Sequence, residues 1–161
     1  MQESDRKIFN HLKVHTQYSI CQGAVKIEDL KDYCKENKVK SLGLSDTSNL
    51  CGALEFSEKI SKSGSQPIIG TQINFKVGET MGLIPLFALN EKGYKNIIEL
   101  SSISYLKNDE LSEPHLEFNK LLSNSEGVAV FSGTVFGLFG QLFDKGKFTE
   151  IHDLYLEIKK I

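Results

Sequence analysis

Stretches with the pattern of buried strands alternate with helical repeats along the first part of the chain. Residues 9–14 are a short mixed run that predicts a strand followed by a polar loop, and apolar residues then recur at helical spacing over 27–38. Residues 41–44 predict a second buried strand, and residues 50–62 predict a second helix, which a following glycine ends. The pattern therefore predicts a strand–loop–helix unit that occurs twice.

The second part of the chain continues this alternation without a linker or a low-complexity segment. Its apolar runs and turn residues predict strands at 67–75, 84–89 and 128–131 and helices at 94–106, 116–122 and 148–158. Strands that alternate with helices imply right-handed crossovers and a largely parallel sheet.

Chain length decides between the two architectures that such an alternation favours. An open doubly wound sheet fits, and so does part of a barrel, but a complete eight-fold barrel needs ~250 residues and the chain has 161. The last predicted helix has an apolar face and stands where the alternation requires another strand. We therefore expect an α/β fold of alternating strands and helices, truncated before a barrel closes.

Composition narrows the functional classes. Nineteen basic and twenty-one acidic residues give a formal charge of −2, so no global positive field draws the chain to DNA or to anionic lipid. No apolar run approaches the ~20 residues that cross a bilayer, and the charged start lacks a signal peptide, which predicts a cytoplasmic protein with no membrane contact. The three cysteines lack CxxC spacing, which predicts buried reduced thiols.

Candidate functional residues follow the predicted strands, because loops at the carboxyl ends of strands carry the sites of α/β proteins. Three such segments stand out: 11–19, 44–50 and 69–72. His11 and His15 are four residues apart in a predicted strand, which places them on the same side. A histidine pair alone is more typical of hydrogen-bonded structure than of zinc, which takes three or four protein ligands.

Other candidates have simpler interpretations. Asp46 precedes a predicted helix, so it is at least as well suited to cap that helix as to catalyse. We expect His115 and His152 to be solvated. The glycine-rich stretch 133–140 lacks the Lys-Ser/Thr of a P-loop, and Ser132 lacks the GxSxG of a nucleophile elbow.

Five motifs in a fixed order carry a family resemblance. They are His-Leu-x-x-His-Thr-x-x-Ser at 11–19, Leu-Ser-Asp-x-x-Asn-Leu-x-Gly-Ala-Leu-Glu-Phe at 44–56, Pro-Ile-Ile-Gly at 67–70, Asn-Glu-Lys-Gly-Tyr-Lys-Asn at 90–96 and Leu-Ser-Ser at 100–102. This order resembles the N-terminal polymerase and histidinol phosphatase (PHP) domain of bacterial DNA polymerase III alpha subunits. The resemblance implies a distorted barrel of strands and helices, with residues 1–8 as a tail and 9–161 as the N-terminal portion of the PHP domain.

Three positions depart from the pattern of the active members, which hold metal ions through His, Asp and Glu. Where those members carry His-x-His, Asp-His and a strand glutamate, this chain has Lys13, Thr47 and Gln72. An ammonium offers no lone pair to a metal, although Lys13 is able to fill the vacant metal position itself. We therefore expect no bound metal and no catalytic residue in this segment. The vestigial metal-site positions are His11, Lys13, His15, Asp46, Thr47 and Gln72.

The resemblance implies a non-catalytic role in DNA replication. A metal-depleted PHP domain is expected to support the polymerase and to dock the proofreading exonuclease (epsilon) subunit within the replicase holoenzyme. The parent DNA-directed DNA polymerase, a Mg²⁺-dependent nucleotidyltransferase, would carry its catalytic aspartates far beyond residue 161 and make the contacts with DNA. One alternative is a metal-dependent phosphoesterase or 3′–5′ exonuclease that uses the residual ligands His11, His15 and Asp46. Another is a free-standing PHP-like binding protein.

Overall fold

A computed structural model describes residues 9–106 and 112–159, so the expected tail at 1–8 lies outside the described residues. The molecule is α/β, with helices that alternate with strands around one five-stranded sheet. The strands are β1 (Ser41–Thr47), β2 (Gln66–Val77), β3 (Thr80–Ala88), β4 (His115–Glu117) and β5 (Val128–Val130). The helices are α1 (Ile27–Asn37), α2 (Ala53–Lys62), α3 (Glu91–Leu106), α4 (Phe118–Ser123), α5 (Leu138–Asp144) and α6 (Phe148–Ile158).

The sheet is mixed and open, with the order β1-β2-β3-β5 and β4 paired to β2. Strand β2 is parallel to β1 and β4, whereas β3 is antiparallel to both β2 and β5. The expected α/β class and the incomplete closure are confirmed, but the expectation of a largely parallel sheet is wrong. The reason is the two-residue turn between Val77 and Thr80, where Gly78 has a φ of 57° and folds β2 and β3 into a hairpin.

Three further segments differ from expectation. Residues 9–14 are not a strand and contribute only an isolated bridge from Val14 to Leu44. The helix expected over 116–122 divides into β4 and α4, because the short apolar run supplies a strand before it turns into a helix. Helix α5 lies in the glycine-rich stretch and was not expected. The helices expected over 27–38, 50–62, 94–106 and 148–158 are present, with ends shifted by a few residues.

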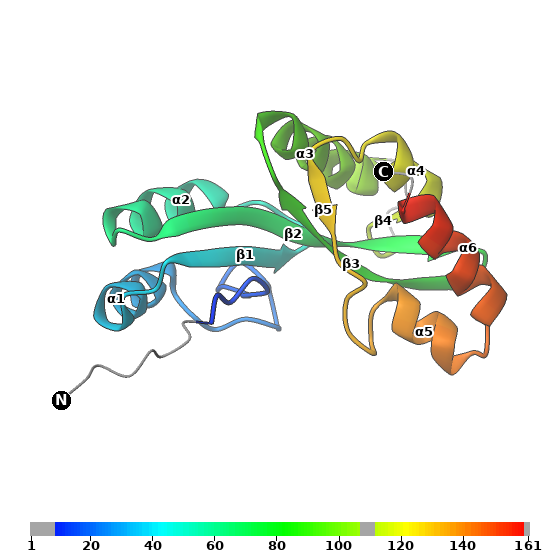
Figure 1. Ribbon diagram of the computed structural model, residues 1–161, viewed down its shortest axis with the longest axis horizontal. Coiled ribbons are helices and arrows are strands. Elements are labelled where there is room, and N and C mark those ends of the chain that lie inside the picture. Colours follow the sequence, from blue (N-terminus) through cyan, green and yellow to red (C-terminus); the bar gives the residue numbers. More distant parts are fainter. Residues whose placement is uncertain (1–8, 107–111, 160–161) are drawn as a thin grey trace.

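Two buried clusters hold the elements together. One packs α1 and α2 against β1 and includes Ile27, Leu44 and Phe56, all fully buried. The other surrounds β2 and β3 and extends to α3, α4, α5 and α6. Figure 1 shows α1 and α2 at one end of the long strands and α3 to α6 at the other. The carboxyl end of β1 therefore lies between the two packed groups.

The cysteines are free, but only one matches the expected burial. Cys34 is buried in α1, whereas Cys21 and Cys51 are exposed. The expectation of three buried thiols is wrong because Cys21 and Cys51 lie in loops before α1 and α2. Among the described helices, none combines the length and the apolar character needed to cross a membrane.

Candidate functional site

Parallel pairing of β1 and β2 brings the second and third motifs together. In this register Asp46 lies opposite Thr71, and Thr47 lies opposite Gln72. The first motif reaches the same place because its loop bonds to β1, with the Ser45 amide donating to the carbonyl of Val14 at 2.8 Å. The fold therefore assembles five of the six vestigial positions, from Lys13 onward, around the end of β1.

Thr47 and Gln72 form a neutral hydrogen-bond chain. Gln72 Nε2 donates to Thr47 Oγ1 at 2.7 Å, and the Thr47 hydroxyl donates to Oε1 of Gln22. Gln72 is only 2% exposed, and its Oε1 atom has no hydrogen-bond partner. Two of the positions that depart from the active pattern are therefore bonded to each other.

Asp46 is fully buried and binds the loop of the first motif. Its carboxylate accepts from the Thr16 amide at 2.6 Å, from the Thr16 hydroxyl at 2.7 Å and from the Ser19 hydroxyl at 2.6 Å. The expected helix-capping role is wrong, because the N-cap residue of α2 is Gly52 and no side chain caps the helix. Instead, Asn49 bonds to the Cys51 amide within that loop. Asp46 therefore acts as an internal anchor for residues 16–19.

The three basic positions of the first motif occupy different environments. His15 is half-buried and its Nδ1 lacks a partner, while His11 and Lys13 are exposed. Burial and the nearby charge of Lys13 lower the pKa of His15, and the carboxylate of Asp46 opposes this shift. The expectation that His11 and His15 share one side of a strand is wrong, because this segment is a loop. The His11 ring packs edge-on against Phe9, with a centroid separation of 4.8 Å.

The other two histidines lie on β4 and on α6. His152 is exposed on α6, as expected. His115 is half-buried rather than solvated, and its Nδ1 lies 2.8 Å from the carbonyl oxygen of Glu113. The His115 ring therefore contacts the backbone just before β4.

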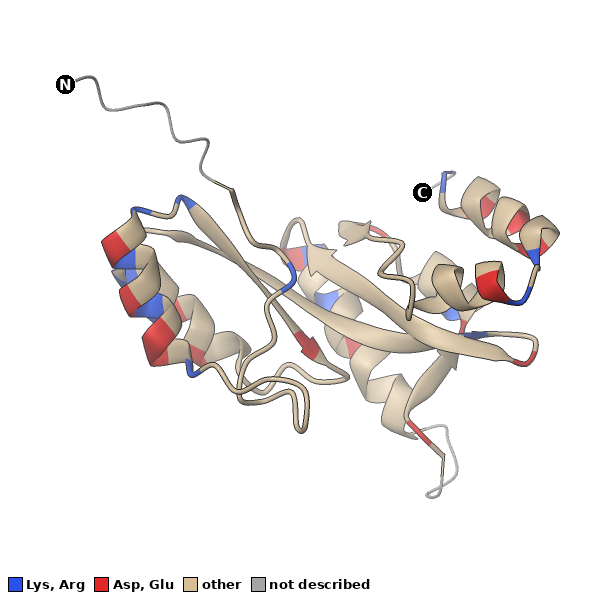
Figure 2. Ribbon diagram, turned by 90° about the horizontal axis from the view of Figure 1, so that it is seen from below, with Lys and Arg blue, Asp and Glu red and all other residues tan. Residues whose placement is uncertain are grey.

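The donors around β1 do not fit a divalent metal. Across residues 9–106 and 112–159, no group of three His, Cys, Asp or Glu side chains is placed to hold a metal ion. Both oxygens of Asp46 already accept hydrogen bonds from Thr16. Within β1, β2 and β3 the charged residues are Asp46 and Lys76, and Figure 2 shows that charge gathers instead on the helices and turns.

A cavity of about 410 Å³ opens beside the Thr47–Gln72 pair. It lies between the ends of β1 and β2, the start of β3, the residues before β4 and the region around α5. Its lining is Gln22, Thr47, Ser48, Asn74, Met81, Gly82, Leu83, Glu113, Pro114, Phe136 and Gln141. The sequence motifs contained Thr16 and Ser19 but gave no role to them, and Gln22, Asn74 and Gln141 had no signal in the sequence.

The open α/β sheet and the motif residues near the ends of β1 and β2 are the features to compare with known domain families. The profile of the family described as "PHP domain" matches residues 11–161. The chain therefore belongs to the PHP domain family.

Its relatives include large polymerase subunits. The chain is 37% identical over 170 residues to the DNA polymerase III subunit alpha of Caulobacter vibrioides, covering 100% of this chain and 15% of that protein. It is 34% identical over 169 residues to the subunit of the same name from Borreliella burgdorferi, covering 98% of this chain and 15% of that protein. The predicted resemblance is confirmed, and the chain spans about 15% of the length of these relatives.

One solved structure illustrates more distant similarity. An amidohydrolase from Chromobacterium violaceum aligns with a TM-score of 0.49 and 16% identity, covering 59% of this chain and 32% of that chain.

Proposed function

We propose that this chain is the N-terminal PHP-domain segment of the alpha subunit of a replicative DNA polymerase III. In this role it is a non-catalytic scaffold that supports the polymerase and docks the proofreading exonuclease (epsilon) subunit. The match of nearly the whole of this chain to part of relatives named DNA polymerase III subunit alpha supports this proposal. Polymerisation, the Mg²⁺ that it requires, the DNA contacts and the cytoplasmic location then belong to the parent replicase.

The observation that carries the non-catalytic part is the direct bond between Thr47 and Gln72. A metal-dependent phosphoesterase or exonuclease needs several lone-pair donors that converge on one ion. Here Gln72 donates a hydrogen bond to Thr47 at 2.7 Å, and the carboxylate of Asp46 accepts hydrogen bonds from Thr16 and Ser19. These hydrogen bonds within the protein support the proposal that the segment is not catalytic.

A binding experiment tests the docking role. The full chain is mixed with the cognate exonuclease subunit, and association is followed by calorimetry and by co-elution. We expect a stoichiometric complex, and an unrelated exonuclease of similar size serves as the negative control. Absence of association by both methods would remove the docking role.

A nuclease assay tests the catalytic alternative separately. The full chain is incubated with single-stranded DNA and with a phosphomonoester in the presence of Zn²⁺ or Mn²⁺. We expect no turnover above that of the Asp46→Asn variant. Turnover that is lost in Asp46→Asn but retained in the exposed control Asp153→Asn would assign the chain to the metal-dependent enzymes.

A further inference from the structure

The cavity beside β1 has a consistent chemical character. Its polar lining consists of neutral amides and hydroxyls, from Gln22, Thr47, Ser48, Asn74 and Gln141. Among the residues that the structure describes, its charged lining residue is Glu113, and no Lys, Arg or His lines it. A phosphate or carboxylate ligand would find no cation there to pair with. The cavity therefore disfavours anions.

One hydrogen-bond acceptor beside the cavity has no donor. The Thr47 hydroxyl uses its single proton on Gln22 and accepts from Gln72. Gln72 Oε1 is left as a buried acceptor without a partner. A buried oxygen of this kind destabilises the folded chain unless something donates a hydrogen bond to it. Asn74 is two residues further along β2 and lines the cavity with its amide, whereas Gln72 lies beside the cavity and is not itself a lining residue.

The rim adds an aromatic surface. Phe136 lines the cavity and is 81% exposed, so its ring is free to cover a ligand that enters. Planar organic cations stack on aromatic rings and donate several hydrogen bonds in fixed directions. Lys13 of the first motif is exposed and does not line the cavity. The ammonium of Lys13 therefore does not fill this space.

We propose that this cavity binds an organic cation, a guanidinium or an alkylammonium group. Glu113 supplies the negative charge, the amides and Thr47 accept its hydrogen bonds, and Phe136 covers it. Two sources present this chemistry, an Arg or Lys side chain of a bound protein and a free amine. The inference stands apart from exonuclease docking, because it rests on the cavity alone.

Calorimetric and NMR titration of the full chain test the proposal, with N-acetylargininamide as the probe and N-acetylcitrullinamide as its uncharged control. We expect saturable binding of the arginine compound, weakened by salt, and at least tenfold weaker binding of the citrulline compound. Equal binding of the two compounds, or no binding of either, would overturn the proposal. Spermidine and an arginine-containing peptide, titrated in parallel, distinguish a free amine from a protein side chain.

Two variants locate the site. Glu113→Gln changes an exposed residue, so it should fold normally and weaken binding by about threefold to tenfold. Glu117→Gln, an exposed change on β4 outside the cavity, is the matched control and should bind like the parent chain. Asn74→Leu removes an amide that lines the cavity and should also weaken binding, with thermal unfolding used to confirm its fold. Unchanged affinity in Glu113→Gln would overturn the assignment even if Asn74→Leu does not fold.

Discussion

Asp46 binds Thr16 through both carboxylate oxygens, one to the backbone amide at 2.6 Å and one to the hydroxyl at 2.7 Å. The two residues are thirty positions apart in sequence, so this contact fixes a loop on the end of a strand. Ser19 adds a third bond to the same carboxylate and donates from its hydroxyl, which also accepts from the Thr47 amide at 3.1 Å. A residue that resembles a metal ligand is therefore part of the structural framework.

Replacing Asp46 should destabilise the fold in a graded manner. Asp46→Ala leaves the Thr16 amide and two hydroxyls without their acceptor, and we expect a loss of about 2–4 kcal/mol in the free energy of unfolding. Asp46→Asn keeps a similar shape and one acceptor oxygen, so about 1 kcal/mol is expected. Urea unfolding measures both. The exposed change Asp153→Ala should stay within about 0.5 kcal/mol, and a similar loss in all three variants would contradict the role of Asp46.

Restoring the lost ligands should restore metal binding. Thr47 and Gln72 touch, so Thr47→His and Gln72→Glu place two donors side by side, and Lys13→His removes the ammonium and adds a third. We expect the triple variant to retain stoichiometric zinc after purification without chelator, whereas the parent chain retains only traces. Elemental analysis measures both. Stoichiometric zinc in the parent chain would support the enzyme alternative, and a metal-free triple variant would show that the ligand geometry itself has been lost.

The spacing of hydrophobic residues in the sequence correctly predicted the helices in which buried residues recur at helical intervals. Ile27, Leu30 and Cys34 recur at helical intervals, and all three lie on the buried face of α1. Helix α5 escaped prediction because glycines normally end helices. In the structure, a Cβ atom at Gly140 would lie 2.2 Å from the carbonyl oxygen of Val135. Close packing requires this glycine inside the helix, and such a requirement is visible only in three dimensions.

The site was predictable in its positions but not in its contacts. The family resemblance predicted Thr47 and Gln72 as positions where active members carry metal ligands, and the strand register places the two residues opposite each other. The bond from Thr47 to Gln22 and the anchoring of Thr16 by Asp46 join residues 25 to 30 positions apart. No local pattern encodes such pairings, because they depend on where β1 lies relative to a loop without regular structure.

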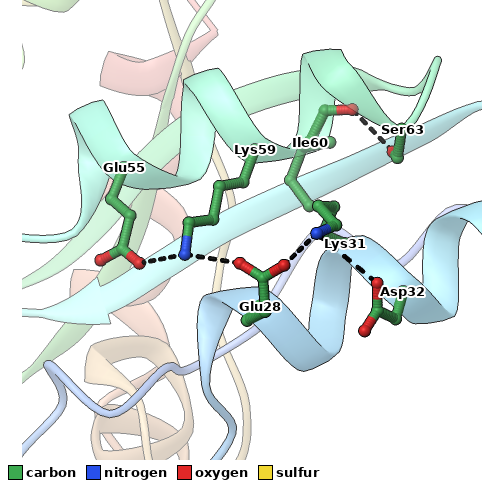
Figure 3. A network of polar contacts seen from close by, with 7 residues as sticks. All are labelled: Glu28, Lys31, Asp32, Glu55, Lys59, Ile60 and Ser63. Carbon is green, nitrogen blue, oxygen red and sulfur yellow. Dashed lines mark hydrogen bonds and ion pairs between the residues drawn. The ribbon is translucent and has the colours of Figure 1, made fainter.

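An ion-pair network between α1 and α2 should make stability depend on pH. Glu28 bonds to Lys31 and to Lys59, and Lys59 also pairs with Glu55 at 3.0 Å (Figure 3). Hydrogen bonds from Lys31 and Lys59 lower the pKa of Glu28 from 4.5 to about 2. Because the folded pKa lies below the unfolded one, this contribution is present above 4.5 and is lost as the pH falls toward about 2.

The Glu28→Gln variant isolates that contribution. We expect it to be less stable than the parent chain near neutral pH, with the difference shrinking as the pH falls through the window from 4.5 to about 2. Urea unfolding at several pH values measures the difference. Glu58→Gln, an exposed change on α2, controls for the loss of one carboxylate. A difference that is independent of pH would show that packing, and not the ion pairs, accounts for any effect.

The surface around α5 should make the isolated chain self-associate. Val135 is 74% exposed and Phe143 is 65% exposed, and within the described sheet β5 pairs only with β3. Exposed apolar patches and unpaired strand edges both promote association. We expect light scattering with size-exclusion chromatography to show oligomers whose size rises with concentration.

A double variant tests whether this surface is responsible. Val135→Ser with Phe143→Ser should shift the chain toward a monomer, because the polar side chains remove the gain from burying the patch. Leu54→Ser is the matched control, since Leu54 is 73% exposed but lies on α2, and it should leave the oligomers unchanged. A monomer that melts cooperatively in the parent chain would contradict the prediction. An equal shift in the control would instead indicate general apolar association rather than association through the α5 surface.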